Sequence, residues 1–147
     1  MIGTWLYTRT MRAAFGHFGR HDIESFSRPW AEDVVFVYPP GTSMGGRFEG
    51  KEAMKAWIQS YMDRFPRIEF TVKGVFVEDP LGLKSNVVTT EWDVAITNRR
   101  GEDFVYGGVT VIRVEKTKVV LAKDYLFDTS VVRRALGEDD ERQSRAS

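Results

Sequence analysis

Two aspartates stand out in the segment VVLAKDYLFDTS, which otherwise has the composition of a β-strand. Asp124 lies in the middle of this segment and Asp128 near its end. A buried carboxylate is costly unless a partner pairs with it or it keeps its proton. Asp128 is expected to cap a following helix. The alternating residues that would share a face with Asp124 are apolar and favour its burial, although an outward orientation stays open: Val120, Ala122 and Leu126.

A carboxyl group held in a dry pocket has a raised pKa and can take a proton from an activated carbon and return it. Asp124 is therefore the first candidate for an acid/base group. Tyr38 could offer a hydroxyl to a ligand, although buried tyrosines more often pack and bond to a neighbour. Further candidates for the lining of a pocket are Phe36, Trp57 and Tyr61.

The two histidines, His17 and His21, fall near the end of the first predicted helix. His17 could face a pocket as a base. Two histidines without a third ligand make a weak metal site, and the chain has no cysteine. The sequence therefore predicts neither a metal nor another cofactor.

Apolar spacing of three to four residues predicts helices over residues 4–18, 22–30 and 47–65, with Asp22 as an N-cap. A strand is expected at residues 33–38, followed by a flexible loop. The period then changes to two, and four long strands are predicted. They cover residues 67–79, 85–98, 102–115 and 118–128, with a bulge or sharp bend at Gly107-Gly108.

Helices that precede an antiparallel meander indicate an α+β fold. One domain is expected over residues 1–136, and the polar segment 137–147 is expected to be a disordered tail. The curved sheet would wrap around the N-terminal helices and leave an internal pocket.

Composition excludes several other classes of protein. The 21 basic and 21 acidic side chains give no net charge, and no basic run suggests nucleic acid. No segment resembles a signal peptide or a membrane span, so we expect a cytoplasmic protein without a membrane partner.

The order of these elements, together with FSRPWAEDVVFVYPPG, GRFEGKEAMKAWI and KVVLAKDYLFDTSVVRRAL, resembles the NTF2-like superfamily over residues 5–136. Within it, the SnoaL-like branch is the most similar: polyketide cyclases, ketosteroid isomerases and limonene-epoxide hydrolases. The resemblance implies a cone-shaped fold, a pocket for a small hydrophobic molecule, and often a homodimer packed through the sheet. The fold hosts unrelated activities, so it does not by itself assign a reaction.

Measured against the isomerases, the chain departs at all three catalytic positions. Tyr38 stands where their base is expected, Ala14 near their oxyanion tyrosine, and Thr110 near their protonated aspartate. These departures argue against isomerisation by that mechanism.

The epoxide hydrolases match at two carboxylates, Asp124 and Asp93. Their bridging arginine is replaced by Glu91, and their water-positioning residues fall at Phe36 and Tyr38. Three ionised carboxylates in one pocket would repel one another, so one would keep its proton. The alternative for Asp93 is a position facing solvent, opposite a buried or dimer-forming face made of Trp92, Val94 and Ile96.

The SnoaL-type cyclases require the fewest catalytic residues, because one acid/base aspartate promotes their ring closure. Asp124 matches this aspartate. The sequence therefore predicts a SnoaL-like protein with Asp124 and Asp93 as catalytic candidates. Its ligand-binding candidates are Tyr38, Glu91, Phe36, Trp57, Tyr61 and His17. The alternative is a non-catalytic ligand-binding or dimerisation module with the same fold.

Overall fold

The computed structural model describes residues 2–82, 85–139 and 145–146. In chain order the elements are α1 (Ile2–Gly19), α2 (Ile23–Ser27), β1 (Trp30–Tyr38), β2 (Gly46–Glu49), α3 (Lys51–Arg64), β3 (Arg67–Val77), β4 (Ser85–Thr97), β5 (Asp103–Glu115), β6 (Lys118–Leu126) and α4 (Thr129–Ala135). Within the described residues, no helix combines the length and the apolar run that crossing a membrane requires.

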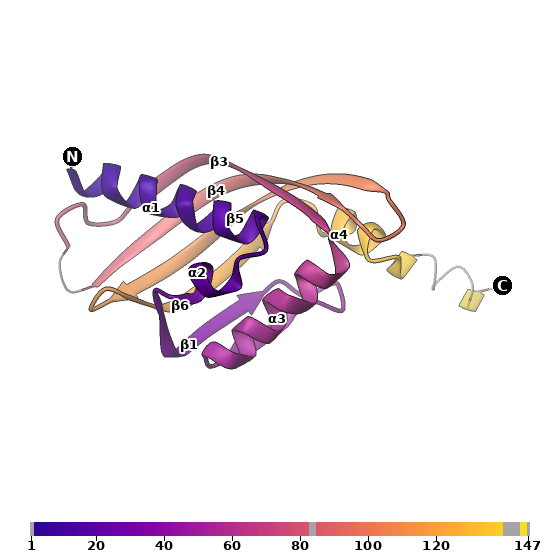
Figure 1. The fold of residues 1–147 in the computed structure, drawn as a ribbon, viewed down its shortest axis with the longest axis horizontal. Helices are drawn as coiled ribbons and strands as arrows, with labels where there is room; N and C mark the ends of the chain where they lie inside the picture. The colour runs from indigo at the N-terminus through magenta and orange to yellow at the C-terminus, as the bar shows by residue number, and fades with distance from the viewer. Residues whose placement is uncertain (1, 83–84, 140–144, 147) are drawn as a thin grey trace.

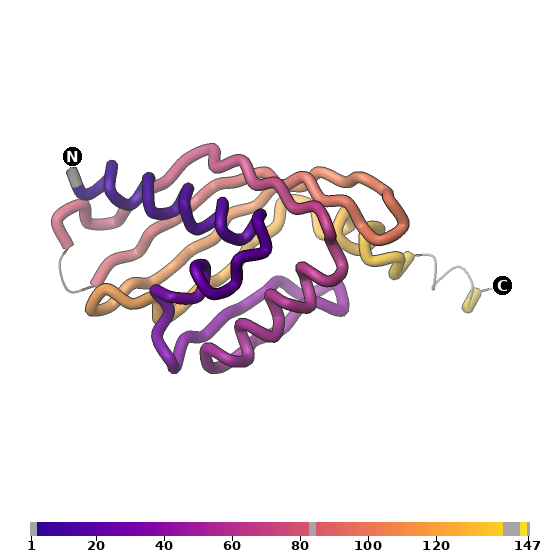
Figure 2. Tube along the Cα trace, in the orientation of Figure 1, coloured from indigo at the N-terminus to yellow at the C-terminus, as the bar shows by residue number. Residues whose placement is uncertain are grey.

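The six strands form one curved sheet in the order β2-β1-β6-β5-β4-β3. Neighbouring strands are antiparallel except β1 and β6, which run parallel. Helices α1, α2 and α3 lie on one face of this sheet, as Figures 1 and 2 show. The α+β class and the sheet curved around N-terminal helices are as the sequence predicts. We call the face toward these helices the inner face and the opposite one the outer face.

The helices begin and end where local chemistry requires. Asp22 caps α2, because its side chain accepts a hydrogen bond from the Ser25 amide at 3.1 Å. Helix α3 begins after Gly50 and ends just before Pro66. Its apolar stripe packs against the sheet through five buried residues: Met54, Trp57, Ile58, Tyr61 and Met62. The short strand β2 was not predicted, since its four largely exposed residues show no alternation between apolar and polar.

Strand β4 separates its two faces cleanly. Trp92, Val94 and Ile96 are buried on the inner face, within the core of the same chain. They are therefore not available as a dimer interface in this fold, which answers one of the alternatives that the sequence left open. A partner that packs on the sheet would contact the outer face.

The bulge or bend expected at Gly107-Gly108 does not interrupt the register of β4 with β5, which runs unbroken through Asp93↔Gly107 and Trp92↔Gly108. Register shifts occur elsewhere, for example between Val72 and Gly74 in β3. The two glycines are needed for close approach instead. A Cβ at Gly108 would overlap the backbone carbonyl oxygen of Tyr125 and lie 2.9 Å from the ring of Trp92. One at Gly107 would lie 2.7 Å from a carboxyl oxygen of Asp93 and 3.1 Å from the ring of Phe127.

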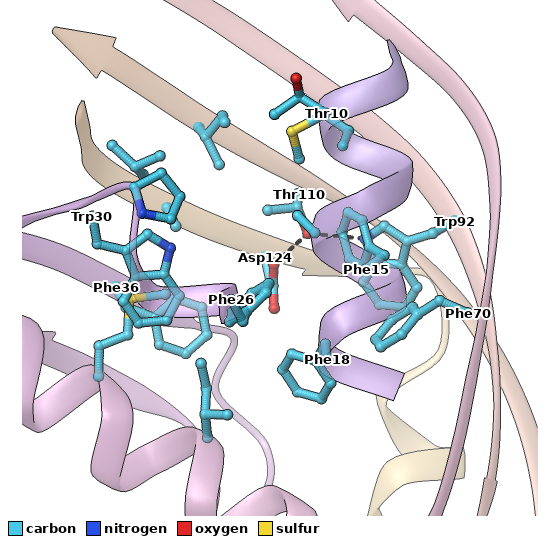
Figure 3. Close-up of a pocket in the computed structure, with 18 of the residues that line it drawn as sticks. Thr10, Phe15, Phe18, Phe26, Trp30, Phe36, Phe70, Trp92, Thr110 and Asp124 are labelled. Carbon is cyan, nitrogen blue, oxygen red and sulfur yellow. Dashed lines mark hydrogen bonds between the residues drawn. The ribbon is translucent and has the colours of Figure 1, made fainter. Parts of the chain in front are cut away.

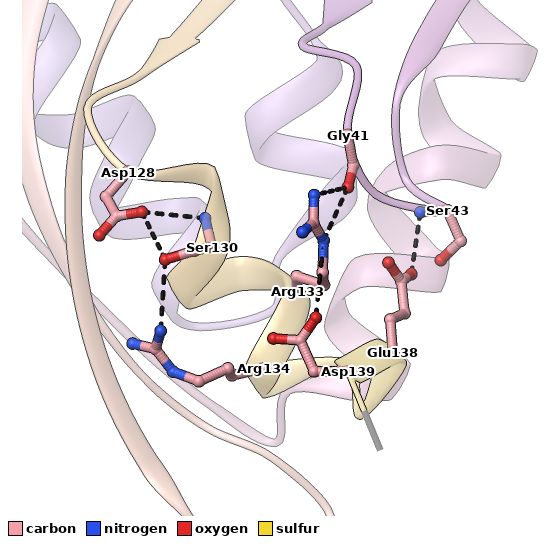
Figure 4. Close-up of polar contacts among 8 residues, drawn as sticks. All are labelled: Gly41, Ser43, Asp128, Ser130, Arg133, Arg134, Glu138 and Asp139. Carbon is pink, nitrogen blue, oxygen red and sulfur yellow. Dashed lines mark hydrogen bonds and ion pairs between the residues drawn. The ribbon is translucent and has the colours of Figure 1, made fainter. Parts of the chain in front are cut away.

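Helix α4 fastens the C-terminal region to the loop between β1 and β2 (Figure 4). Asp128 caps α4 as predicted, accepting from the Ser130 amide at 3.0 Å. Arg133 donates to the carbonyl of Gly41 at 2.9 Å, and the Ser43 amide donates to Glu138 at 2.8 Å. The first residues of the segment expected to be disordered therefore have defined contacts. Most of the remaining tail lies outside the described residues.

Candidate functional site

An apolar cavity of about 320 Å³ lies between the inner face of the sheet and the helices α1, α2 and α3. Its volume falls at the lower end of the range that is usual for small-molecule sites. Aromatic rings form much of its wall, among them Phe15, Phe18, Phe26, Trp30, Phe36, Trp57, Phe70 and Trp92. Asp124 is the single charged residue of the wall within the described part of the chain.

Asp124 reaches the cavity from β6, where it pairs across the sheet with Thr110 of β5. The Thr110 hydroxyl donates to Oδ1 of Asp124 at 2.6 Å, and the indole N–H of Trp92 donates to the same hydroxyl at 2.9 Å. Figure 3 shows this chain of two hydrogen bonds. An indole N–H can only donate, so the one proton of the Thr110 hydroxyl is committed to Asp124.

The direction of the hydrogen bond from Thr110 decides which oxygen of Asp124 carries a proton. Oδ1 accepts from Thr110 in both charge states of the carboxyl group. Oδ2 has no hydrogen-bond partner among the described residues, and the side chain lines the cavity. The proton of the neutral acid is therefore on Oδ2, where a ligand could receive it.

The chain of hydrogen bonds depends on Gly108. Trp92 and Gly108 are cross-strand neighbours, and the indole lies over the glycine on its way to Thr110. A side chain at this position would meet the indole ring at 2.9 Å, closer than real Cβ contacts. The backbone carbonyl of Tyr125 on β6 and the indole of Trp92 on β4 together leave no room for a side chain at Gly108.

Burial raises the pKa of Asp124 from an ordinary 3.8 to about 7, and the hydrogen bond from Thr110 lowers it in part. No positive charge among the described residues contributes to this balance. The carboxyl group is enclosed by protein, and the surface that it still exposes lines the cavity. It can therefore both take and give a proton near neutral pH.

Three tyrosines form a second polar group in the pocket wall: Tyr38 from β1, Tyr61 from α3 and Tyr106 from β5. The hydroxyls of Tyr61 and Tyr106 are hydrogen-bonded at 2.5 Å. The hydroxyl of Tyr38 is buried beside them and forms no hydrogen bond of ordinary geometry to any described residue. Burial raises the pKa of all three phenols, so they remain neutral donors at physiological pH.

Several residues predicted for the pocket lie there together: Tyr38, Phe36, Trp57, Tyr61 and Asp124. Trp57 is held in place because its indole donates to the Met44 carbonyl at 2.9 Å. Its ring lies against Phe36 and Tyr38, with centroids 4.7 and 4.8 Å away. Strand β1 and helix α3 thus place these predicted residues on one wall.

Asp93 and Glu91 do not share the pocket with Asp124. Both lie on the outer face of β4, where Lys73 pairs with Glu91 at 3.6 Å and with Asp93 at 3.7 Å. The side chain of Asp93 is 45% exposed. Alternation along β4 sends these acids outward because Trp92 and Val94 point inward. The arrangement of two carboxylates expected from the epoxide hydrolases is therefore absent from this pocket.

His17 is also outside the pocket wall. Arg20 donates to its Nδ1 at 3.0 Å, and a carboxyl oxygen of Asp22 lies 3.7 Å from the same nitrogen. The ring thus belongs to the polar connection between α1 and α2. Among the described residues, no three His, Asp or Glu side chains are grouped so that they could hold a metal ion.

Sequence reasoning missed Thr110, Trp92 and Tyr106 as pocket residues. Period-two alternation places Tyr106, Gly108 and Thr110 on one face of β5, which was a usable signal. The link between Thr110 and Asp124 depends on the register of β5 with β6, and that register is not visible in either strand alone.

With this geometry in view, comparison with known proteins defines the class. Residues 11–122 match the model of the SnoaL-like domain, and the chain belongs to this family. No curated protein matches the chain.

Three solved structures illustrate the fold. A candidate isomerase from Bacillus subtilis is 25% identical, with 88% of this chain and 91% of that chain covered and a TM-score of 0.73. A candidate scytalone dehydratase from Novosphingobium aromaticivorans is 15% identical, with coverages of 87% and 89% and a TM-score of 0.73. A candidate polyketide cyclase from Xanthomonas campestris pv. campestris is 16% identical, with coverages of 87% and 94% and a TM-score of 0.63. The TM-scores support the NTF2-like fold, whereas identities this low leave the reaction open.

Proposed function

We propose that this protein binds a small hydrophobic molecule in the pocket and acts on it by acid/base chemistry at Asp124. The observation that supports this most directly is the carboxyl group itself. It lies in an aromatic cavity, its Oδ1 is committed to Thr110, and its Oδ2 is left for a ligand. The names of the similar structures, isomerase, dehydratase and cyclase, agree with acid/base chemistry on small molecules.

The substrate we favour carries a carbonyl group. Ionised Asp124 would take a proton from the carbon beside the carbonyl, and the electron pair would move onto the carbonyl oxygen to give an enolate. The same carboxyl group would then return the proton at another position, or the enolate carbon would close a ring on a second carbonyl. Tyr38 is the proposed donor to the enolate oxygen, because its buried hydroxyl has no partner of ordinary geometry in the described structure. Epoxide opening is less well supported, since Asp93 and Glu91 are on the outer face.

Exchange of hydrogen for deuterium tests this proposal without the natural substrate. The protein is incubated in D₂O with 2-tetralone, a hydrophobic ketone with acidic C–H bonds, and exchange is followed by proton NMR. We expect exchange faster than in buffer, rising with pH through about 7 as Asp124 ionises. Asp124→Asn should reduce the catalysed rate by roughly 100-fold or more.

Asp93→Asn is the matched control, since it removes the same charge from the outer face of the sheet. It should keep the exchange rate of the wild type. Equal rates for Asp124→Asn and wild type would overturn the proposal. Binding of the ketone without exchange would favour the second candidate, a non-catalytic binding module. This candidate is suggested because the described residues place no second carboxyl group in the cavity wall.

We also propose that two copies pair through the outer face. This face carries Val105, Tyr125 and Phe127, which are 65%, 47% and 64% exposed. A single chain rarely leaves several large apolar side chains exposed on one sheet face without a partner. Val105→Glu should convert a dimer to a monomer in light scattering coupled to size exclusion. A wild-type protein that is monomeric at high micromolar concentration would contradict this pairing.

A further inference from the structure

The charge inventory of the cavity points to a ligand class that is narrower than hydrophobic molecules in general. No lysine, arginine or histidine is part of the wall within the described structure. The titratable groups that face the cavity with Asp124 are phenols from α1, β1, α3 and β5: Tyr7, Tyr38, Tyr61 and Tyr106. The neighbours of Asp124 on β6 point to the outer face, where Lys123 lies over the ring of Tyr125 at 5.2 Å. An ionised Asp124 thus has no cation to balance it from any packed element.

A buried carboxylate without a counter-ion is an incomplete electrostatic site. The hydrogen bond from Thr110 stabilises the charge only in part, because the desolvation of Asp124 outweighs it. A ligand that brings a positive charge to Oδ2 would form a charge-assisted hydrogen bond at the one oxygen left without a partner. A ligand that brings a carboxylate or phosphate would meet a like charge in a medium of low dielectric, with nothing to neutralise it.

The wall around Asp124 suits a cation as well. Figure 3 shows the carboxyl group among the aromatic side chains of Phe15, Phe18 and Phe26. Phe18 and Phe26 pack edge to face with their centroids 5.2 Å apart, and Phe15 lies 4.9 Å from Phe70. Aromatic faces attract ammonium groups, and they do so more strongly when water is excluded. The same rings provide an apolar surface for the body of such a ligand.

We propose that the pocket is a binding site for lipophilic amines, with the ammonium group paired to Asp124 and an aromatic or alicyclic body within the ring-lined cavity. The inference shares its pocket with the proposed function but does not require turnover. Such an amine would act as a regulatory ligand, because an Asp124 paired with an ammonium group is not free to serve as the acid/base group. The selectivity comes from Asp124, the single charged group of the wall among the described residues.

Three probes of nearly the same shape test this selectivity: 2-naphthylmethylamine, 2-naphthalenemethanol and 2-naphthoate. Their affinities for the wild type are measured at pH 8 by calorimetry. We expect the amine to bind about tenfold or more tightly than the alcohol, and the alcohol more tightly than the acid. The affinity for the amine should fall about tenfold between pH 8 and pH 6, as Asp124 takes up a proton, while the alcohol changes little.

Asp124→Asn should remove the preference for the amine over the alcohol and change the affinity for the alcohol by no more than about twofold. Asp93→Asn should keep the full preference. If Asp124→Asn fails to fold, the pH series on the wild type decides alone. An amine that binds no more tightly than the alcohol, or a preference that survives Asp124→Asn, would overturn the inference.

The outcomes separate this inference from the proposed function. Exchange of the ketone without a preference for amines leaves acid/base catalysis standing and rejects the amine site. Tight amine binding without exchange does the reverse.

Discussion

Replacing Asp124 by asparagine should make the fold more stable at pH 8 and leave its stability almost unchanged near pH 4. Asparagine has nearly the same shape and keeps an acceptor oxygen for the Thr110 hydroxyl, so the packing and the hydrogen bond of Oδ1 are retained. What is lost is the ability to become charged inside the cavity. The variant therefore isolates the free energy of ionising this one carboxyl group.

The sign follows from the direction of the pKa shift. The pKa of Asp124 is about 7 in the folded protein and close to 3.8 in the unfolded chain. Between these values the folded protein holds a proton that the unfolded chain has released, so the stability of the wild type falls as pH rises. Below about pH 4 both states are protonated, and above about pH 8 both are ionised, so the difference between variant and wild type is constant at each end.

The size of the effect comes from the same values. At about 1.4 kcal/mol for each pH unit, the shift corresponds to about 4 kcal/mol of stability lost by the wild type above neutral pH. This is an upper figure, because part of the Asp124 side chain remains accessible in the cavity. It is a large part of the 5–15 kcal/mol that typically separates folded from unfolded protein.

Urea unfolding followed by tryptophan fluorescence provides the measurement, at a fixed protein concentration and at several pH values from 4 to 9. The quantity of interest is the free energy of unfolding of Asp124→Asn minus that of the wild type. It should rise between pH 4 and pH 7 and then level off. The same difference for Asp93→Asn, on the outer face, should not follow this course. A flat difference for Asp124→Asn over the whole range would refute the argument that burial controls this group.

Three further outcomes are expected. Thr110→Val should raise the pKa of Asp124 further, because the stabilising donor is lost, and Thr110→Ser should restore it; carboxyl ¹³C NMR titration measures both. Tyr38→Phe should change the free energy of unfolding by less than about 0.5 kcal/mol or increase it, because the Tyr38 hydroxyl has no hydrogen bond of ordinary geometry among the described residues. Tyr61→Phe should lower the free energy of unfolding by about 1–3 kcal/mol, because it breaks the buried hydrogen bond with Tyr106. Gly108→Ala should cost about 1–3 kcal/mol in the same urea assay, because the new methyl group meets both the backbone carbonyl of Tyr125 and the indole of Trp92; an unchanged stability would contradict this explanation.

Much of the fold is predictable because helical spacing marks the main helices and an alternating pattern marks the long strands after residue 66. The stripe of α3 and the alternation of β4 each bury the residues that their periods indicate. Strand β2 escapes such reasoning, because its four residues gain their role only by pairing with β1. Gly107 and Gly108 are unusual in a strand, and the structure explains them by the close approach of neighbouring side chains and, at Gly108, of the Tyr125 backbone carbonyl.

The candidate site is predictable in part. The apolar neighbours of Asp124 along β6 favour its burial, and in the structure Asp124 lines the cavity. For Asp93 the alternation of β4 indicates an outward position, whereas the resemblance to epoxide hydrolases places it in the pocket; the alternation is correct. The registers of β4, β5 and β6, which non-local packing determines, bring Trp92 to Thr110 and Thr110 to Asp124.

The parallel pairing of β1 with β6 has a consequence for the order of folding. Strand β6 lies between β1 and β5, so it joins the two parts of the sheet and brings Asp124 to the cavity at the same time. A chain still being synthesised has β1 and β2 available long before β6, with the edge of β1 unpaired. Contacts so distant in sequence are closed late and slowly. We therefore expect the cavity and its acid to be completed late, so that a partly folded chain lacks both the ligand pocket and the buried carboxyl group.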